Sequence, residues 1–234
     1  MLWYFNARSP NKVKWSIIIT LSQAYMLQFI QLLNQRYQSV LNQPGNESGK
    51  SDYQQRIDQL ILTEAFLRKG QLDNALPKQP LQITVVGPTQ AGKSSLVNVL
   101  LNGDVAGVSP LAGYTIHPQG FCLGVNLDDC SGLQRYFGRF QQMQQSLMPR
   151  NRYDCYSLTE TGSETLCVPD CVLWDTPDFD SIDSLIYREG VIRSIALADI
   201  IILVVSKEKY ADQSVWDIMS ALEALHQPTI ICLN

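Results

Sequence analysis

Apolar residues recur at helical spacing over the first part of the chain. Between residues 15 and 42 they follow a period near 3.6, at Ile18, Leu21, Tyr25, Phe29, Leu32 and Val40. The segment PGNESGK breaks this pattern, and a second apolar pattern begins after Ser51, a suitable helix N-cap, and stops at Gly70. Two prolines in LPKQP, residues 76–80, prevent a helix from continuing. We therefore expect a helical hairpin over residues 1–76, joined by this hinge to a second domain over residues 77–234.

From residue 81 onward, short apolar runs alternate with segments of helical periodicity. The pattern predicts strands at 81–87, 120–126, 171–177, 200–206 and 228–234, and helices at 93–101, 184–198 and 211–225. This alternation is typical of an α/β fold of three layers, a mostly parallel sheet with helices on both faces. We expect the strand at 120–126 to lie at the edge of the sheet.

The stretch 127–170 departs from this alternation. It contains the helix-like segment LQRYFGRFQQMQQSLM, followed by a polar run rich in Ser and Thr. We therefore interpret residues 127–170 as an insertion at the sheet edge.

An apolar run near the N-terminus, WSIIITLSQAYMLQFIQLL, follows three cationic side chains and superficially suggests a membrane segment. A spanning helix needs about 20 predominantly apolar residues, and Ser, Thr and Gln interrupt this run. We therefore expect an amphipathic helix that packs against the rest of the protein. Docking of residues 17–33 on a membrane surface is the alternative, and it would make the protein peripheral at a membrane.

Composition indicates a globular protein with no broad affinity for nucleic acid. Hydrophobic residues make up 45% of the chain and charged residues 17%, and the formal net charge is -4. The six cysteines form no CxxC pair, and with two histidines the usual zinc spacings are missing. We expect reduced thiols and a cytoplasmic location.

The sequence GPTQAGKS, Gly87 to Ser94, matches the phosphate-binding pattern G-x-x-x-x-G-K-[ST] at every fixed position. A buried strand precedes it and a helix follows, so successive backbone N–H groups and the helix dipole would face the phosphates. Gly87 would permit the turn out of the strand, and Gly92 a close approach of the backbone to the phosphates. Lys93 is the expected partner of the β and γ phosphates, and the Ser94 hydroxyl the expected ligand of Mg²⁺.

Two further positions complete the predicted metal site. Asp175 ends the apolar strand in VLWDTPDFDS, and a parallel neighbour would bring it beside the phosphate loop, where it can hold Mg²⁺ through water. Thr115, in the polar loop VSPLAGYTIHPQG, is the candidate that closes over the γ phosphate and the metal, with Ser109 as the alternative. His117 is interpreted as a loop residue without a catalytic role.

The order of GPTQAGKSSLVNVL, a threonine loop, WDTPD and ADIIILVVSKEKYADQSVWDIMSALEALHQPTIICLN resembles the translation-factor-related GTPases of the Era and dynamin-like groups, over about residues 81–234. The resemblance implies GTP and Mg²⁺ as ligands. It also implies that Asn234 is the first residue of the family's Asn-Lys-x-Asp motif, which reads the guanine base. We therefore expect a chain that stops within this motif. The nucleotide-binding residues expected are Gly87, Pro88, Thr89, Gln90, Ala91, Gly92, Lys93, Ser94, Ser95, Asp178 and Asn234.

Two departures from the family pattern bear on catalysis. Asp178 replaces the glycine of Asp-x-x-Gly, and its carboxylate would repel a γ phosphate unless it points away. Phe179 follows, where Ras-like members carry the glutamine that orients water. We therefore expect slow hydrolysis, with Lys93, Thr115 and Gln90 as the catalytic candidates and Thr89 as a further group near the γ phosphate.

Three functions remain open from the sequence. The first is a GTPase that acts as a conformational switch and works with a protein partner, in which the helical hairpin transmits or receives the change. The second is a nucleotide-binding interaction module without hydrolysis, and the third is an ATP-using P-loop protein.

Overall fold

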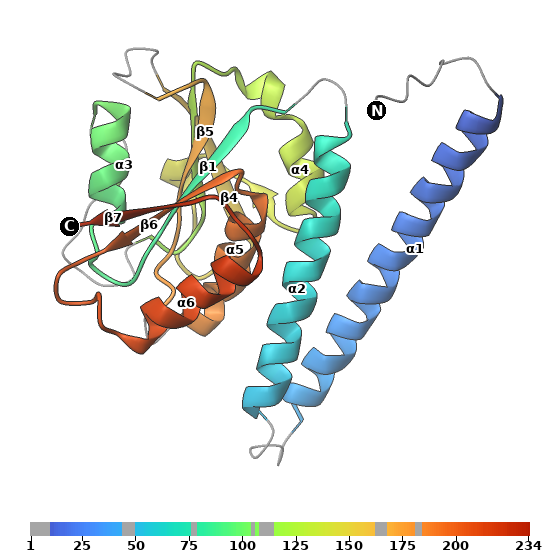
Figure 1. Ribbon diagram of the computed structural model, residues 1–234, viewed down its shortest axis with the longest axis horizontal. Coiled ribbons are helices and arrows are strands. Elements are labelled where there is room, and N and C mark those ends of the chain that lie inside the picture. The colour runs from blue at the N-terminus through green and yellow to red at the C-terminus, as the bar shows by residue number, and fades with distance from the viewer. Residues whose placement is uncertain are drawn as a thin grey trace, which may run out of the picture. The chain divides into compact units, whose positions relative to one another are not determined.

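The computed structural model describes residues 10–43, 50–75, 79–103, 106–107, 115–161, 168–180 and 184–234 (Figure 1). The chain divides into two compact units, residues 1–67 and 68–234. The division falls inside helix α2, whereas the sequence places a domain boundary at 76/77. That domain boundary stays a prediction, and part of the predicted hinge lies outside the described residues.

The first unit contains a pair of helices, as the sequence predicts. Helix α1 spans Pro10–Leu41 and helix α2 spans Lys50–Asp73. Gln31 Nε2 donates a hydrogen bond to Glu64 Oε1 at 3.1 Å, and the rings of Tyr37 and Tyr53 lie 6.0 Å apart between centroids. These contacts join the C-terminal part of α1 to α2.

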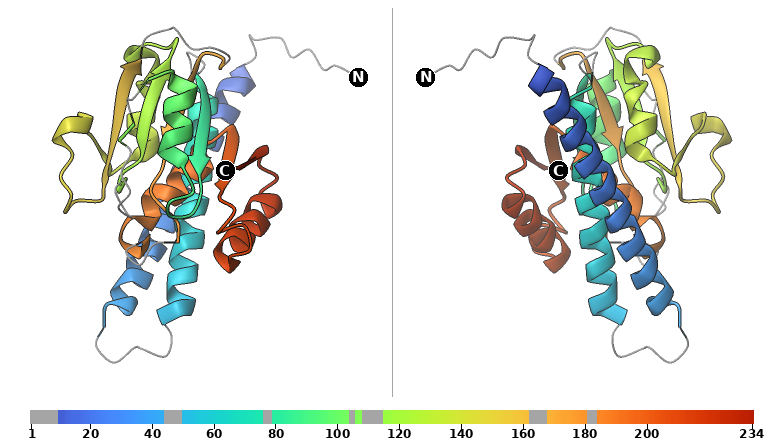
Figure 2. Two further views of the ribbon diagram at one scale, coloured as in Figure 1. Left: turned by 90° about the vertical axis from the view of Figure 1, so that its left-hand side faces the viewer. Right: turned by 90° about the vertical axis from the view of Figure 1, so that its right-hand side faces the viewer.

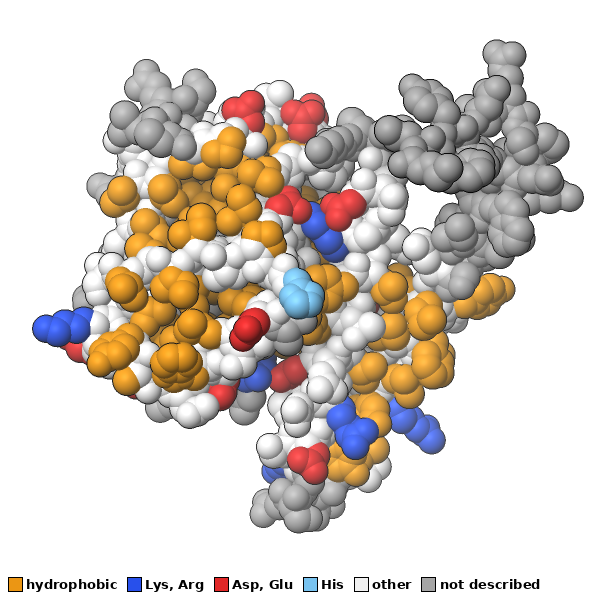
Figure 3. All heavy atoms as spheres, viewed as in Figure 1, with side chains coloured by type: hydrophobic (Ala, Val, Ile, Leu, Met, Phe, Trp, Pro, Cys, Tyr) orange, Lys and Arg blue, Asp and Glu red, His pale blue; other side chains and the backbone are white. Residues whose placement is uncertain are grey.

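Where the side chains of α1 are described, much of the predicted apolar stripe is exposed. Tyr25, Phe29 and Leu32 are exposed, whereas Ile30 is buried. Apolar side chains are accordingly visible on the surface of this helix (Figure 3). Apolar residues occupy more than one side of this helix, so spacing alone could not select the packed side. None of the helices that the structure describes is both long enough and apolar enough to cross a bilayer.

The second unit is built on a twisted sheet with the strand order β3-β4-β2-β5-β1-β6-β7 in the described residues. Every neighbouring pair is parallel except β2 and β5. The strands are β1 Leu81–Val86, β2 Gln119–Leu123, β3 Gln141–Gln142, β4 Cys155–Thr161, β5 Cys171–Asp175, β6 Ile200–Val205 and β7 Thr229–Leu233.

Helices cover both faces of this sheet, which confirms the predicted three-layer α/β fold (Figures 1 and 2). Side chains alternate along β6, so that Val204 belongs to the core that contains Val97 of α3, and Leu203 to the core that contains Val191 of α5 and Val215 of α6. These helices are α3 Lys93–Leu101, α5 Ser184–Leu197 and α6 Gln213–Ala224.

The expectation that the strand at 120–126 lies at the edge of the sheet is wrong. The strand at 119–123 lies inside the sheet, because β4 pairs with it on the outer side and β3 pairs with β4. The polar run within 127–170 contains β4, a strand that the sequence analysis did not predict, in which Tyr156 and Leu158 are buried. Because β4 and β3 lie at the edge of the sheet, the interpretation of residues 127–170 as an insertion there stays a prediction. CYSLTET contains an aromatic residue and two threonines, and aromatic and β-branched side chains fit a pleated, half-buried surface. The segment can therefore form a strand although it also contains several polar side chains.

The helix expected in LQRYFGRFQQMQQSLM is also shorter than predicted. Helix α4 spans Gly132–Phe137, and Gly138 ends it with a φ of 65°. The sequence then turns into β3 and a short 3-10 turn at Gln145–Leu147. A glycine with a left-handed backbone is a common way to end a helix, and the periodicity on either side of it hid the stop.

Candidate phosphate-binding site

The segment from Gly87 to Gly92 makes a bend between β1 and α3, as the motif predicts. A Cβ atom at Gly87 would lie 2.4 Å from the carbonyl oxygen of Val204 on β6, so only glycine fits at the exit of the strand. Gly92 has a φ of 96°, a left-handed conformation that favours glycine. The two glycines therefore shape the bend for different reasons, one for space and one for backbone conformation.

Lys93, the first residue of α3, points back into the bend. Its Nζ donates to the carbonyl oxygen of Pro88 at 3.0 Å and forms an ion pair with Asp178 Oδ1. Both side chains are largely buried, at 5% and 12% exposure. The carboxylate that we expected to repel a γ phosphate therefore lies on the lysine that would bind that phosphate.

Ser94 and Asp175 meet next to this ion pair. The Ser94 hydroxyl donates to Asp175 Oδ2 at 2.7 Å. The contact follows from the sheet, because Asp175 pairs in register with Val85 on β1 and so lies beside the strand that leads into the loop. Parallel strands end at the same edge, which is why the sequence could anticipate this meeting.

Asp175 is fully buried and has an unusual environment for a carboxyl group. Burial raises its pKa to about 6, although the Ser94 hydrogen bond, the charge of Lys93 and the nearby hydroxyl of Thr115 act to lower the pKa. Its Oδ1 atom is buried with no partner at hydrogen-bond geometry. A buried oxygen of this kind is costly unless a ligand completes its coordination.

These oxygens fit a magnesium ion. Magnesium prefers oxygen ligands and binds through one or two carboxylates or hydroxyls together with water and phosphate. The unpartnered Oδ1 of Asp175 and the hydroxyl of Ser94 are donors of this type, and Thr115 is buried beside them.

Asp180 is a residue of the site that the sequence analysis missed. Its Oδ1 accepts hydrogen bonds from the backbone N–H of Thr89 at 2.5 Å and from the Thr89 hydroxyl at 2.8 Å. Its Oδ2 lies 3.1 Å from Lys209 Nζ. Burial acts to raise the pKa of Asp180, but these bonds and the Lys209 charge outweigh it and lower the pKa. No spacing in VLWDTPDFDS distinguishes Asp180 from its acidic neighbours, so only the fold could identify it.

Asn234 reaches the opposite side of the loop. Its Nδ2 donates to the carbonyl oxygen of Ala91 at 3.0 Å. A Cβ atom at Gly92 would lie 2.4 Å from the same amide nitrogen, so Gly92 also makes room for Asn234. The order β1-β6-β7 brings the residue after β7 to this place.

The remaining predicted residues lie at the tip or to the side of the loop. Gln90, with a φ of 59°, and Ser95 are exposed. Phe179 packs against the core formed with α5 and α6.

The His117 ring is buried, and its Nε2 forms a hydrogen bond with the Arg152 carbonyl oxygen, while burial lowers the pKa of His117. Ser109 lies outside the described residues.

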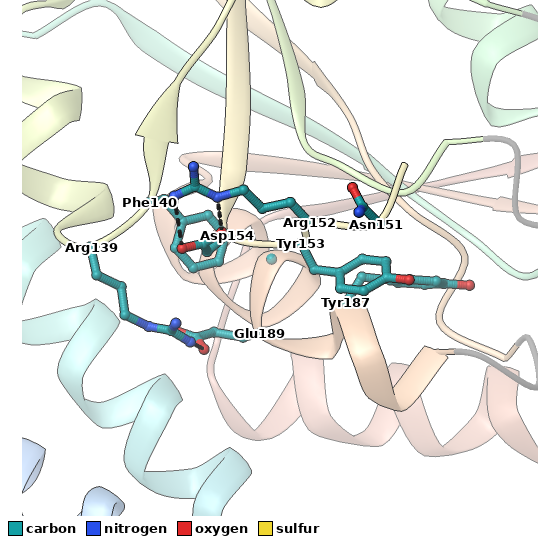
Figure 4. A pocket seen from close by; sticks show the side chains of 9 residues that line it. Arg139, Phe140, Asn151, Arg152, Tyr153, Asp154, Tyr187 and Glu189 are labelled. Atoms are coloured by element: carbon teal, nitrogen blue, oxygen red, sulfur yellow. Dashed lines mark hydrogen bonds and ion pairs between the residues drawn. The ribbon is translucent and has the colours of Figure 1, made fainter. Parts of the chain in front are cut away.

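A second hollow, which we call the edge pocket, has a volume of about 330 Å³ (Figure 4). Its charges are paired within the pocket wall, Arg152 with Asp154 at 2.6 Å and Arg139 with Glu189. It shares no residue with the phosphate loop. The lining residues are Arg139, Phe140, Asn151, Arg152, Tyr153, Asp154, Tyr187, Glu189 and Gly190.

Comparison with known proteins gives one result that agrees with this geometry. No curated protein matches the chain. A family model described as 50S ribosome-binding GTPase matches residues 82–234, which include the phosphate loop, Asp175 and Asn234. The chain therefore belongs to this GTPase family, and its second unit is a P-loop G domain that binds GTP.

Proposed function

We propose that this G domain hydrolyses GTP slowly with the help of Mg²⁺ and works as a conformational switch. The observation that carries the proposal is the pairing of Ser94 with Asp175 beside Lys93, with one buried Asp175 oxygen left unpartnered. A carboxyl oxygen held without a partner next to a phosphate loop fits a metal that arrives together with the nucleotide.

In this proposal each loop residue has a distinct role. The backbone from Gly87 to Ser95 surrounds the phosphates, and Lys93 binds the β and γ phosphates. Ser94, Thr115 and Asp175 hold Mg²⁺, Asp175 through water. The bound metal would neutralise charge that develops on the phosphate oxygens. Asn234 is the candidate reader of the guanine base.

Slow hydrolysis follows because the part of the chain that the structure describes has no evident residue to orient water. Phe179 packs into an apolar core, and the Thr89 hydroxyl is bound by Asp180. Gln90, exposed at the tip of the loop, is the remaining candidate for this role. An exposed side chain at this position supports modest rather than rapid turnover.

The switch would operate through residues on both sides of the metal site. Thr115 and Asp178 belong to separate segments, and each lies close to Asp175 or Lys93. A γ phosphate with its metal would bind Thr115 and compete with Asp178 for Lys93, so both segments would change, and hydrolysis would reverse the change. A protein partner that responds to this change, a cytoplasmic location and membrane docking stay predictions, as does the finer resemblance to the Era or dynamin-like groups.

A binding module without hydrolysis is the second candidate function. The ion pair between Asp178 and Lys93 favours it, because the lysine needed for catalysis is already engaged by a carboxylate. Release of inorganic phosphate from GTP distinguishes the two, because a pure binding module releases none.

The test combines calorimetry with a phosphate-release assay on the wild-type chain, Lys93→Ala and Ser94→Ala. Hydrogen bonds to charged groups contribute about 1.5–3 kcal/mol, so Lys93→Ala should weaken GTP binding roughly 10- to 100-fold. Ser94→Ala should lose mainly the part of the affinity that Mg²⁺ adds over EDTA. ATP should bind more weakly than GTP.

Lys50→Ala serves as the control, because Lys50 is exposed at the start of α2. Its affinity for GTP should equal that of the wild type, and thermal unfolding should show that every variant is folded. Equal GTP affinity in Lys93→Ala and the wild type would contradict the proposed use of the loop. GTP binding without any phosphate release would favour the binding module.

A further inference from the structure

Two carboxylates from one segment occupy donors of the phosphate loop. Directly after β5, the segment TPDFD, residues 176–180, brings Asp178 to the Lys93 ammonium and Asp180 to the N–H and hydroxyl of Thr89. These donors belong to the loop that would otherwise face an anionic ligand. The segment therefore presents negative oxygens to the same groups that a nucleotide uses.

Burial makes the ion pair between Lys93 and Asp178 difficult to separate. The Asp178 and Lys93 side chains are 12% and 5% exposed, so water screens their attraction weakly. Lys93 also donates to the Pro88 carbonyl oxygen within the bend, so the ammonium is held inside the loop. A phosphate that approaches Lys93 must share the ammonium with Asp178 or displace it.

We propose that Asp178 acts as an internal competitor for the terminal phosphate and thereby sets the preference between GTP and GDP. This inference rests on the binding of the phosphates to Lys93 in the proposed function. A γ phosphate brings further negative charge to the ammonium that Asp178 occupies, and the two anions repel each other. GDP brings one phosphate fewer and leaves the Asp178 carboxylate more room. Asp178 therefore disfavours GTP relative to GDP.

Asp180 is the positioning residue for this competition. It is held on one side by Thr89 and on the other by Lys209, with its side chain 8% exposed. These bonds fix the chain just beyond Asp178 against the loop. Without the Asp180 charge, the segment would be held less firmly and Asp178 would compete less well.

The experiment measures GTP and GDP affinities by calorimetry, with Mg²⁺ and with EDTA, for the full chain and for Asp178→Asn. The amide keeps the size of the side chain but removes the charge. We expect GTP affinity to rise roughly tenfold, a change that corresponds to about 1.4 kcal/mol, and GDP affinity to rise less. Pyrophosphate, used as a probe without a base, should also bind more tightly to Asp178→Asn.

Asp128→Asn is the matched control, since Asp128 is an exposed carboxylate elsewhere in the G domain. Its ratio of GTP to GDP affinity should equal that of the wild type. Asp180→Asn should raise the same ratio by a smaller factor than Asp178→Asn, whereas general loosening of the loop would change both affinities alike. This variant also keeps the inference testable if Asp178→Asn does not fold.

The outcomes separate the inference from the proposed function. If Asp178→Asn leaves the GTP to GDP ratio unchanged or lowers it while Lys93→Ala still weakens GTP binding, the competition is overturned and the function stands. If Asp178→Asn binds GTP and the wild type does not, the competition is supported in its strongest form. If neither chain binds GTP, GDP or pyrophosphate, both ideas are overturned.

Discussion

The phosphate loop and the edge pocket both contain paired charges, but they pair them differently. At the loop, Lys93 and Asp178 are buried and come from segments 85 positions apart. At the edge pocket, Arg152 and Asp154 are two positions apart, and their side chains are 39% and 30% exposed. The loop therefore places this pair where water cannot stabilise it, whereas the pocket leaves Arg152 and Asp154 in partial contact with solvent.

This difference indicates which of the two regions is the better candidate for a ligand-binding site. Burying a charge is costly, and the attraction of a partner repays that cost only in good geometry. Exposed short-range pairs form readily and contribute little. A buried cation held by a distant carboxylate, next to an unpartnered carboxyl oxygen, is therefore stronger evidence for a ligand site than a larger hollow with satisfied charges.

The largest effect is expected from the aromatic packing near the edge pocket. The Phe137 ring stacks on Tyr156 at 4.1 Å and lies 5.3 Å from Trp174, and all three side chains are buried. Phe137→Ala should lower the free energy of unfolding by about 3–5 kcal/mol through the cavity that it leaves. Urea unfolding followed by fluorescence checks this value, with Leu147→Ala at an exposed position as the control.

The same variant tests whether the two regions are independent. GTP affinity of folded Phe137→Ala, measured well below its unfolding temperature, should match that of the wild type. A clear loss of GTP affinity would show that the edge of the sheet supports the phosphate loop through Trp174, which precedes Asp175 in β5.

The second effect concerns the pH dependence of stability of the chain without nucleotide or metal. The folded state raises the pKa of Asp175 from 3.8 to about 6, so it binds a proton more tightly than the unfolded state does. This contribution is fully present below pH 3.8 and is lost as the pH rises through about 6. The rise in pKa from 3.8 to about 6 corresponds to about 3 kcal/mol of unfolding free energy. Since the side chain is fully buried, solvent does not reduce this value.

Asp175→Asn isolates this contribution. Its amide cannot titrate. The wild type should therefore lose stability relative to the variant from pH 4 to pH 7. Urea unfolding at several pH values measures the difference, which also cancels the titration of other groups. A constant difference over this range would mean that Asp175 is ionised in the folded protein throughout.

The smallest effect is expected from an exposed pair at the edge pocket. Arg139 is 61% exposed, and its partner Glu189 is also bound by Arg193 at 2.9 Å. Arg139→Gln should therefore change the free energy of unfolding by less than about 1 kcal/mol. The change should fade further in 1 M salt, which a second unfolding series checks. A loss of several kcal/mol that persists in salt would remove the contrast between the two regions.

The sequence predicted the centre of the site better than the sheet edge. The motif GPTQAGKS located the bend and the bounds of α3, because two glycines, a strand and a helix leave few alternatives. Asp175 could be placed beside Ser94 because parallel strands end at one edge of a sheet. In contrast, β4 was hidden by its polar residues, which are in a strand only because β2 offers an unpaired edge.

By itself, the sequence determined the strand and helix on either side of the phosphate loop and the chemistry of that loop, because local spacing encodes both. Only the tertiary structure decided three contacts. Asp178 forms an ion pair with Lys93, Asp180 accepts a hydrogen bond from Thr89, and Asn234 donates one to Ala91. These pairs depend on which strands are neighbours and on how far each loop reaches beyond them. Such distances arise from the packing of the whole sheet, and no spacing along the chain records them.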